Sequence, residues 1–496
     1  MFRKDLTRFE SYDKKPRKEK LNCRVKISNV RKINLSADDL VKSLLEISKT
    51  ETVCLLDSGG VSHQGSHLLI AGIEPIETLE IENKTAEETL EVFDRKLAQS
   101  FASIFTISYD FGLKLEKINP RRKKFKAFKE PDVFLALFDC LVIHDYDTSE
   151  TFLIGNKNNF DRIEKILQSS ATFRNSETFC SSSVISNFTR GEYLETIEKI
   201  KELIRRGDTY QTNLTQQIRA KLPENLAPQQ IFWNLRKNHP APFAAFLKRR
   251  DDFVISASPE RFFKVESGKR KAENGVFSDS SLIFHPSSLI SVSPIKGTRP
   301  RGKTFEEDFQ LKNELLNSAK DRAENIMIVD LLRNDIGRIC EFGSVRVERL
   351  CDLAEHPTLF HLVSTINGTL REKLRFSDII RALFPCGSIT GAPKIRTMRI
   401  IDELETANRG LSMGAIGYSV NSEKLKIKNS EKNNFSLFTI PFLLDLSVAI
   451  RTMVVRNSEA IFNVGGGIVI DSIPEQEYEE TLIKAKALLQ SINAKL

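Results

Sequence analysis

Carboxylates in two segments of the C-terminal half could bind a metal ion. Glu477 and Glu480 lie three residues apart in the first turn of a predicted helix that opens at Pro474, so they share one face. Glu324 lies in a second predicted helix, over residues 320–335. Either segment alone is also typical of a salt-bridged surface helix, because acidic first turns complement the helix dipole. Carboxylates from two helices suit Mg²⁺, which takes hard oxygen ligands and keeps positions for water and an anionic substrate.

A glycine-rich strand pattern directly precedes the Glu477 helix. Residues 461–470 contain three consecutive glycines, which favours a bulge or a ligand that approaches the backbone closely: Gly465, Gly466 and Gly467. In the preceding strand pattern, residues 447–455, alternation places Arg451 on one face with Ala449 and Met453. An Arg among small apolar neighbours predicts a bidentate carboxylate clamp, whereas an Arg on an edge strand would point to solvent.

Three further features carry chemistry only in combination. Lys296 lies in a turn within residues 293–302, and His361 begins a strand-like run. A loop Lys is usually solvated and a single His is usually structural, so neither predicts catalysis by itself. Residues 387–394 place free backbone N–H groups at the start of a helix, where anions bind. Their glycine spacing differs from that of a nucleotide-binding loop.

The elements that must position these residues become regular only beyond about residue 186. A helix capped by Asn187 or Thr189 and ended by Gly207 is followed by a strand over residues 210–220. We therefore divide the chain into a basic arm (residues 1–24), a region with few catalytic groups (25–185) and a catalytic region (186–496). The catalytic region contains two polar loop insertions, at about residues 271–292 and 421–437.

Composition excludes several classes of function. Residues 1–32 hold twelve Lys or Arg and four Asp or Glu, so this segment carries the whole net charge of +8 and predicts a solvated arm rather than a nucleic-acid interface. No run of about 18 apolar residues could span a membrane, and no apolar segment near the N-terminus resembles a secretory signal. Seven scattered cysteines indicate free thiols in a reducing compartment, which predicts a cytoplasmic protein.

The motifs in the C-terminal half resemble, in number and order, the chorismate-utilising enzymes. The matching strings are PIKGTRPRG, KDRAENIMIVDLLRNDIGR, HLVSTI, GSITGAPKIR, GAIGY, AIRT, GGGIV and EQEYEET. The resemblance covers roughly residues 186–495, with weaker support at residues 55–59. It implies an α+β fold like that of anthranilate synthase component I, in which two large sheets pack face to face and helices surround them.

The resemblance also implies roles for individual residues. It implies that Glu324 and Glu480 bind Mg²⁺, with Glu477 contributing through water, and that His361 lies beside the ring-substitution chemistry. The positions that match chorismate-binding residues of the family are Gly297, Thr298, Tyr418, Arg451, Gly465, Gly466 and Gly467.

Two positions indicate the branch of the family. Isochorismate and salicylate synthases have a Lys at the position of Gln211, as the base that activates water. Gln accepts no proton, so Gln211 points to an enzyme that uses ammonia. Lys296 falls in a PIKGT string like that of aminodeoxychorismate synthases, where anthranilate synthases typically have Ala.

This branch implies covalent catalysis. Lys296 would attack C2 of chorismate and expel the C4 hydroxyl, and ammonia would then enter at C4 as the Lys departs. Glu260, in the string SPERF, matches a family carboxylate that could shuttle the proton. The expected product is 4-amino-4-deoxychorismate, on the route to p-aminobenzoate and folate. The alternatives are an anthranilate synthase component I, which Lys296 argues against, and a non-catalytic scaffold, which the intact ligand set argues against.

The sequence also predicts a partner. No Gly-x-Cys-x-Gly turn of a glutamine amidotransferase is present in the sequence. We therefore expect ammonia to come from a separate glutaminase subunit in a heterodimer. The string Leu55-Leu56-Asp57-Ser58 matches a tryptophan-binding segment of related anthranilate synthases, with Asp in place of the longer Glu, and leaves open whether tryptophan binds.

Overall fold

The computed structural model describes most of the chain between residues 29 and 495. The described ranges are 29–61, 67–125, 128–170, 173, 181–267, 284, 288–355, 359–421 and 442–495. The predicted arm over residues 1–24 and nearly all of the predicted insertion over 421–437 lie outside these ranges. Within them, no helix is both long enough and apolar enough to cross a membrane.

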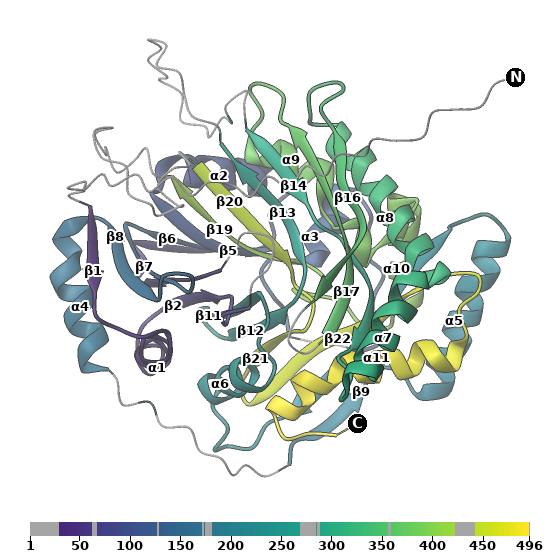
Figure 1. Cartoon of the computed structure of the whole chain (residues 1–496), viewed down its shortest axis with the longest axis horizontal. Coiled ribbons are helices and arrows are strands. Elements are labelled where there is room, and N and C mark those ends of the chain that lie inside the picture. Colours follow the sequence, from purple (N-terminus) through teal and green to yellow (C-terminus); the bar gives the residue numbers. More distant parts are fainter. Residues whose placement is uncertain are drawn as a thin grey trace, which may run out of the picture.

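Two large antiparallel sheets form the centre of the molecule (Figure 1). The first sheet has the order β1 (Val30–Ile33), β8 (Glu150–Gly155), β7 (Cys140–Asp145), β3 (Leu68–Ile73), β2 (Val53–Asp57), β11 (Phe243–Lys248), β12 (Phe253–Ser258), β21 (Thr452–Arg456), β22 (Glu459–Ile468), β10 (Gln211–Lys221) and β18 (Gly391–Ala392), with β9 (Ser183–Ser186) also paired to β10. The second has the order β15 (Ile295–Pro300), β17 (Leu359–Thr369), β14 (Leu289–Val292), β13 (Arg261–Glu266), β20 (Phe442–Val448), β19 (Ala415–Asn421), β5 (Ala102–Ile107), β6 (Val133–Phe138) and β4 (Glu77–Ile81), with β16 (Arg346–Glu355) beside β17.

Helices cover the outer faces of both sheets, so the predicted α+β architecture is confirmed. Those packed on the first sheet are α1 (Ala37–Ile47), α4 (Phe160–Ser169), α6 (Pro228–Asn238) and α11 (Pro474–Ser491). Those packed on the second are α2 (Ala86–Gln99), α3 (Tyr109–Leu115), α8 (Ala319–Gly337) and α9 (Phe376–Leu383). The remaining described helices are α5 (Arg190–Arg205), α7 (Phe305–Asn317) and α10 (Lys394–Leu404).

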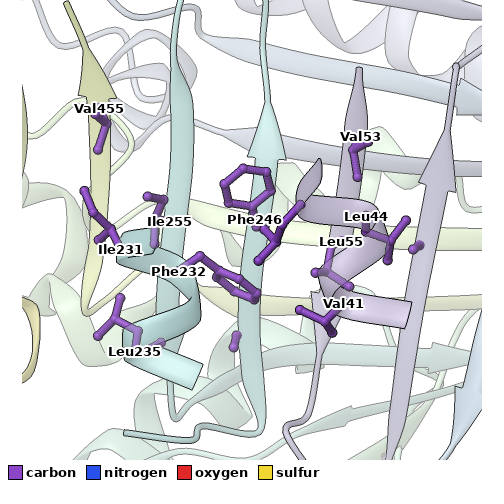
Figure 2. Packing of buried hydrophobic residues seen from close by; sticks show 14 of the residues in the cluster. Val41, Leu44, Val53, Leu55, Ile231, Phe232, Leu235, Phe246, Ile255 and Val455 are labelled. Carbon is purple, nitrogen blue, oxygen red and sulfur yellow. The ribbon is translucent and has the colours of Figure 1, made fainter. Parts of the chain in front are cut away.

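Three apolar layers hold the fold together. One lies between the sheets, where strand residues such as Leu247 and Val254 meet Ile104 and Ile416. The other two lie beneath the helices of each sheet. Figure 2 shows part of the layer on the first sheet, where Phe232 of α6 packs toward the strand residues around it. Burial of these side chains on both faces explains why the strands read as nearly continuous apolar runs.

The structure corrects two details of the sequence interpretation. The predicted strand over residues 447–455 is two strands in different sheets, because the chain leaves β20 at Val448 and enters β21 at Thr452. Arg451 lies in this crossover with φ +47°, so strand alternation does not decide its direction. The predicted loop over 271–292 ends in a strand, since Leu289–Val292 pairs with β13 and β17.

Candidate active site

The predicted catalytic lysine lies next to a glycine bulge at the edge of the second sheet. Register between β15 and β17 shifts between Lys296 and Thr298, and the residue between them, Gly297, has φ +76°. A Cβ at Gly297 would lie 2.8 Å from Leu315 Cδ1 and 3.0 Å from Asp321 Cβ. Only glycine fits this left-handed, crowded position, and a bulge of this kind re-aims the neighbouring side chain.

Lys296 points toward the glycine-rich end of the first sheet. A Cβ added at Gly467 of β22 would lie 2.0 Å from Gln211 Nε2 and 3.5 Å from Lys296 Nζ. Gln211, the first residue of β10, is buried, and its Oε1 accepts no hydrogen bond from the described residues. The structure thus brings Lys296, Gln211 and Gly467 together from three strands of two sheets.

Glu260 is a buried carboxyl group that senses the charge of Lys296. The residue lies between β12 and β13 and is 5% exposed. Burial raises the pKa of Glu260 to about 7, although a hydrogen bond from Ser388 and the charge of Lys296 act in the opposite direction. A carboxyl group with a pKa near neutrality can give and take a proton at physiological pH.

The predicted histidine lies on the strand next to Lys296. His361 and Thr298 are opposite each other in the β15–β17 ladder, and Thr298 Oγ1 lies 2.9 Å from His361 Nδ1 in a hydrogen bond. His361 is 4% exposed. The bonded pair fixes the orientation of the imidazole beside the lysine.

The three predicted metal ligands come from the helices that flank this site. Glu477 and Glu480 lie near the start of α11, which packs on β22, and Glu324 lies in α8, which packs on β15 (Figure 1). A Cβ at Gly466 would lie 3.4 Å from Glu477 Oε2 and 3.9 Å from Glu480 Oε1, so these two carboxylates face one small space above the glycine. Burial raises the pKa of Glu324, the charges of Lys296 and Lys320 lower it, and the charge of Glu477 raises it further, so Glu324 lies within electrostatic range of the same residues.

Two lysines that the sequence analysis did not single out enter the same space. Lys484 Nζ lies 2.7 Å from Glu480 Oε1 and donates to the Gly465 carbonyl at 2.9 Å. Lys320 Nζ lies 3.3 Å from Glu477 Oε1. Spacing could have found Lys484, which follows Glu480 by four residues. It could not have found Lys320, because the ion-pair partner of Lys320, Glu477, lies in another helix.

The carboxylates fit a magnesium ion that keeps most of its water. Among the residues that the structure describes, no three Asp, Glu, His or Cys side chains are placed so that they could hold a metal ion together, so Glu324, Glu477 and Glu480 do not form a ready three-carboxylate site. Mg²⁺ rarely uses a cage of protein ligands alone; it usually takes one or two carboxylates and completes its octahedron with water and substrate oxygens. Carboxylates that could supply such a partial set are present, because Glu480 and Glu477 face the same space above Gly466.

Two predicted substrate-binding residues are not joined to this cluster. Arg451 is enclosed enough that burial lowers its pKa, and the part of the chain described here gives its side chain no hydrogen bond or ion pair with Lys296 or the three glutamates. Tyr418 lies elsewhere, in β19, where it lines a cavity of about 40 Å³ with Asp57, Asp445 and residues of β11. The Tyr418 assignment therefore gains no support from the geometry.

Comparison with known proteins identifies the class to which this fold and site belong. The chain is a member of the chorismate binding enzyme family, whose sequence profile matches residues 51–275, 276–427 and 442–490.

Among individual proteins, it is 32% identical to aminodeoxychorismate synthase component 1 of Bacillus subtilis over 469 residues, covering 87% of this chain and 90% of that protein. Identity to the protein of the same name from Escherichia coli is 34% over 463 residues, with 88% and 92% covered. Identity to anthranilate synthase component 1 of Aquifex aeolicus is 36% over 378 residues, with 73% and 68% covered.

Solved structures agree on the architecture. The anthranilate synthase component I of Streptococcus pneumoniae superposes with a TM-score of 0.67 at 26% identity, covering 86% of this chain and 93% of that one. The menaquinone-specific isochorismate synthase of Escherichia coli shares the fold, with a TM-score of 0.64 at 13% identity and 96% of each chain covered.

Proposed function

We propose that this chain is the subunit of aminodeoxychorismate synthase that converts chorismate and ammonia into 4-amino-4-deoxychorismate. The observation that carries the proposal is the placement of Lys296, whose amine is aimed by the Gly297 bulge at Gly467 and acts electrostatically on Glu260, Glu324 and Glu480. Relatives of that name, matched over most of their length, support the same reaction.

Lys296 is proposed as the nucleophile and Glu260 as its proton carrier. Nζ forms a bond to ring C2, the two double bonds shift, and the C4–O bond breaks. The C4 oxygen leaves as water with a proton that Glu260 supplies. Ammonia then forms a bond to C4, the double bonds return, the C2–N bond to Lys296 breaks, and the new C4 ammonium group gives a proton back to the Glu260 carboxylate. The balance is chorismate plus ammonia giving 4-amino-4-deoxychorismate plus water, with the lysine and Glu260 restored.

Magnesium is proposed as the cofactor of this site. Glu324 and Glu480 would hold it, with Glu477 contributing through water. The bound ion would neutralise the C1 carboxylate of chorismate and stabilise negative charge on the ring. Other residues of the chain would position the substrate. Gly466 leaves space for the ligand beside the carboxylates, and Thr298 orients His361 next to the reacting ring.

The ammonia is proposed to come from a glutamine amidotransferase partner in the cytoplasm. Gln211 occupies the position beside Lys296 and Gly467, and an amide cannot remove a proton from water. Addition of water therefore lacks a base there, whereas ammonia arrives as a nucleophile that needs none. The word component in the names of the relatives supports a partner subunit.

Product identification tests the proposal. The purified chain is incubated with chorismate, Mg²⁺ and ammonium, and the products are separated by chromatography and identified by mass spectrometry. We expect a product that keeps the enolpyruvyl group and yields p-aminobenzoate when a lyase is added. Fluorescent anthranilate with pyruvate release would instead place the chain with the anthranilate synthases.

A Lys296→Ala variant tests the covalent step. Loss of the nucleophile is expected to lower the rate of C4 amination by a factor on the order of 10² or more, because the single displacement at C4 must then proceed unaided. Mass spectrometry of the wild-type protein held with chorismate but no ammonia should show an adduct that the variant lacks. Unchanged turnover in the variant would remove Lys296 from the mechanism.

A further inference from the structure

Asn213 is a buried amide residue beside Lys296 that has no task in the proposed reaction. Asn213 and Gln211 are two residues apart in β10, so their side chains project from the same face of the strand. Asn213 is directly opposite Gly467 in the β10–β22 ladder, and the Cβ positions of such a pair are about 5 Å apart. A Cβ at Gly467 would also lie 3.5 Å from Lys296 Nζ. Asn213 therefore lines the space that Gln211 and Lys296 enter.

Main-chain hydrogen bonds hold Asn213 in place. Its N–H donates to the Thr390 carbonyl at 2.8 Å, and its carbonyl accepts a bond of 2.7 Å from Arg409 Nη2. Arg409 is itself buried, and its Nη2 also lies 2.7 Å from Glu405 Oε1 in an ion pair. The carboxamide of Asn213 is thus carried on a strand whose position is fixed by the protein alone.

Three oxygens at or near this space accept no hydrogen bond from the residues that the structure describes: Gln211 Oε1, Asn213 Oδ1 and Glu260 Oε1. All three residues are almost fully buried. Buried acceptors in proteins are nearly always paired with a donor, because an unpaired acceptor keeps the cost of losing its water. These oxygens therefore mark a place where a ligand with several donors is expected to bind.

A short turn connects the third oxygen with the other two. The turn η2 (Gly387–Ile389) contains Ser388, which forms a hydrogen bond with Glu260. The next residue after η2 is Thr390, whose carbonyl accepts from the Asn213 N–H. The proposed proton carrier and the amide of β10 are therefore held by the same few residues of the chain.

Ammonia has the donors that this set of acceptors lacks. It carries three N–H bonds and one lone pair, so it can donate to three oxygens and still direct its lone pair at ring C4. A water molecule has only two O–H donors. The amide oxygens of Gln211 and Asn213 accept hydrogen bonds but take up no proton. They can hold ammonia beside the ring without converting it or competing for its lone pair.

We propose that Asn213 and Gln211 form the binding subsite for ammonia, and that Asn213 helps to select ammonia as the nucleophile. This inference rests on the proposed use of ammonia by the enzyme. The two amide oxygens hold the nitrogen next to Lys296, on the face of β10 that lies toward Gly467. Asn213 is then a substrate-binding residue for the second substrate of the reaction, not for chorismate.

The Michaelis constants of the two substrates test the subsite. Initial rates are measured for the wild type and for Asn213→Leu over a matrix of ammonium and chorismate concentrations, at one pH and one Mg²⁺ concentration. Leucine has nearly the shape of asparagine but no acceptor, so the KM for ammonium should rise by about tenfold or more. The KM for chorismate should stay within about twofold of the wild-type value. A general disturbance of the fold would not raise one constant alone.

Two variants serve as controls. Asn213→Asp keeps an oxygen acceptor at the same position and should bind ammonium at least as well as the wild type. Asn421→Leu removes an amide at the end of β19, in the other sheet, whose Oδ1 likewise accepts no hydrogen bond within the described part of the chain. This variant should leave both Michaelis constants unchanged.

An unchanged KM for ammonium in Asn213→Leu overturns the inference. A rise confined to the KM for chorismate overturns it as well, because Asn213 would then bind the ring substrate. If Asn213→Leu does not fold, Gln211→Leu removes the other acceptor, and an unchanged KM for ammonium in that variant has the same meaning.

A binding measurement separates this inference from the proposed reaction. Ammonium chloride is titrated calorimetrically into the protein without chorismate, with sodium chloride as the reference salt. The wild type should give a heat of ammonium binding that Asn213→Leu lacks. Absence of an aminated product would overturn the proposed function, whereas equal heats in the two proteins would overturn the ammonia subsite whichever product is formed.

Discussion

At the scale of single residues, Glu260 has the property most accessible to measurement. Its pKa in the folded protein is raised from 4.5 to about 7 because the carboxyl group is buried. The folded state therefore holds this proton more strongly than the unfolded state. The stabilisation from the bound proton is fully present below pH 4.5 and is lost as the pH rises through 7.

Glu260→Gln should remove this pH dependence. We expect the free energy of unfolding of the wild type, relative to the variant, to fall by at most roughly 3 kcal/mol between pH 4.5 and 8. Urea denaturation of both proteins at a series of pH values measures the difference. The pH–rate profile should lose an apparent pKa near 7 in the variant. Parallel stability curves would show that the Glu260 carboxyl is not protonated in the folded protein at neutral pH.

A substitution at Gly466 should affect ligand binding without a large effect on folding. A Cβ there meets only side-chain atoms at ordinary contact distances, the nearest being Glu477 Oε2 at 3.4 Å. Gly466→Ala should therefore change the free energy of unfolding by no more than about 1 kcal/mol. The added methyl group would occupy the space that the Glu477 and Glu480 carboxylates face, so the KM for chorismate should rise by about tenfold or more. Gly191→Ala, whose Cβ meets nothing within 4 Å, is the matched control. A normal KM in Gly466→Ala would place the ligand elsewhere.

At the scale of elements, the bulge in β15 decides where Lys296 points. Gly297→Ala forces an alanine to φ +76° and drives its Cβ to 2.8 Å from Leu315. Gly343→Ala is the control, because Gly343 has φ +75° but no atom within 4 Å of the added Cβ. Both variants should lose about 1–2 kcal/mol from backbone strain. Only Gly297→Ala should also lose activity, measured as kcat for the amination. Equal activity in both variants would show that the bulge does not position the lysine.

The sequence predicted those parts of the site that local patterns encode. Lys296, Gln211 and the three glutamates lie within motifs on single strands or helices, and the structure brings them together. Alternation of apolar residues across 447–455 predicts one continuous strand for Arg451, and it contains no sign that the chain changes sheets between Val448 and Thr452. No local pattern distinguishes Lys320, because a helical lysine is usually solvated and its ion-pair partner, Glu477, lies in another helix.

At the scale of the whole molecule, both sheets combine strands from the two sides of the predicted boundary at residues 185/186. In the first sheet β2 pairs with β11, and in the second β5 pairs with β19. The apolar layer between the sheets is likewise shared by residues from both sides. Local composition and motif density separate the two regions by their chemistry. They contain no information about which strands pair over long distances in the sequence.

The chain is therefore expected to fold as one unit. Cutting at the boundary would expose a long apolar edge on each sheet and divide the layer between them, so fragments 29–185 and 186–495 expressed separately should be insoluble or unfolded. In the whole chain, fluorescence of the single tryptophan, Trp233 in α6, and far-UV circular dichroism should report coincident urea transitions. Two separate transitions, or a soluble 186–495 fragment that binds chorismate, would show that the catalytic region is an independent domain and that the N-terminal strands are dispensable to it.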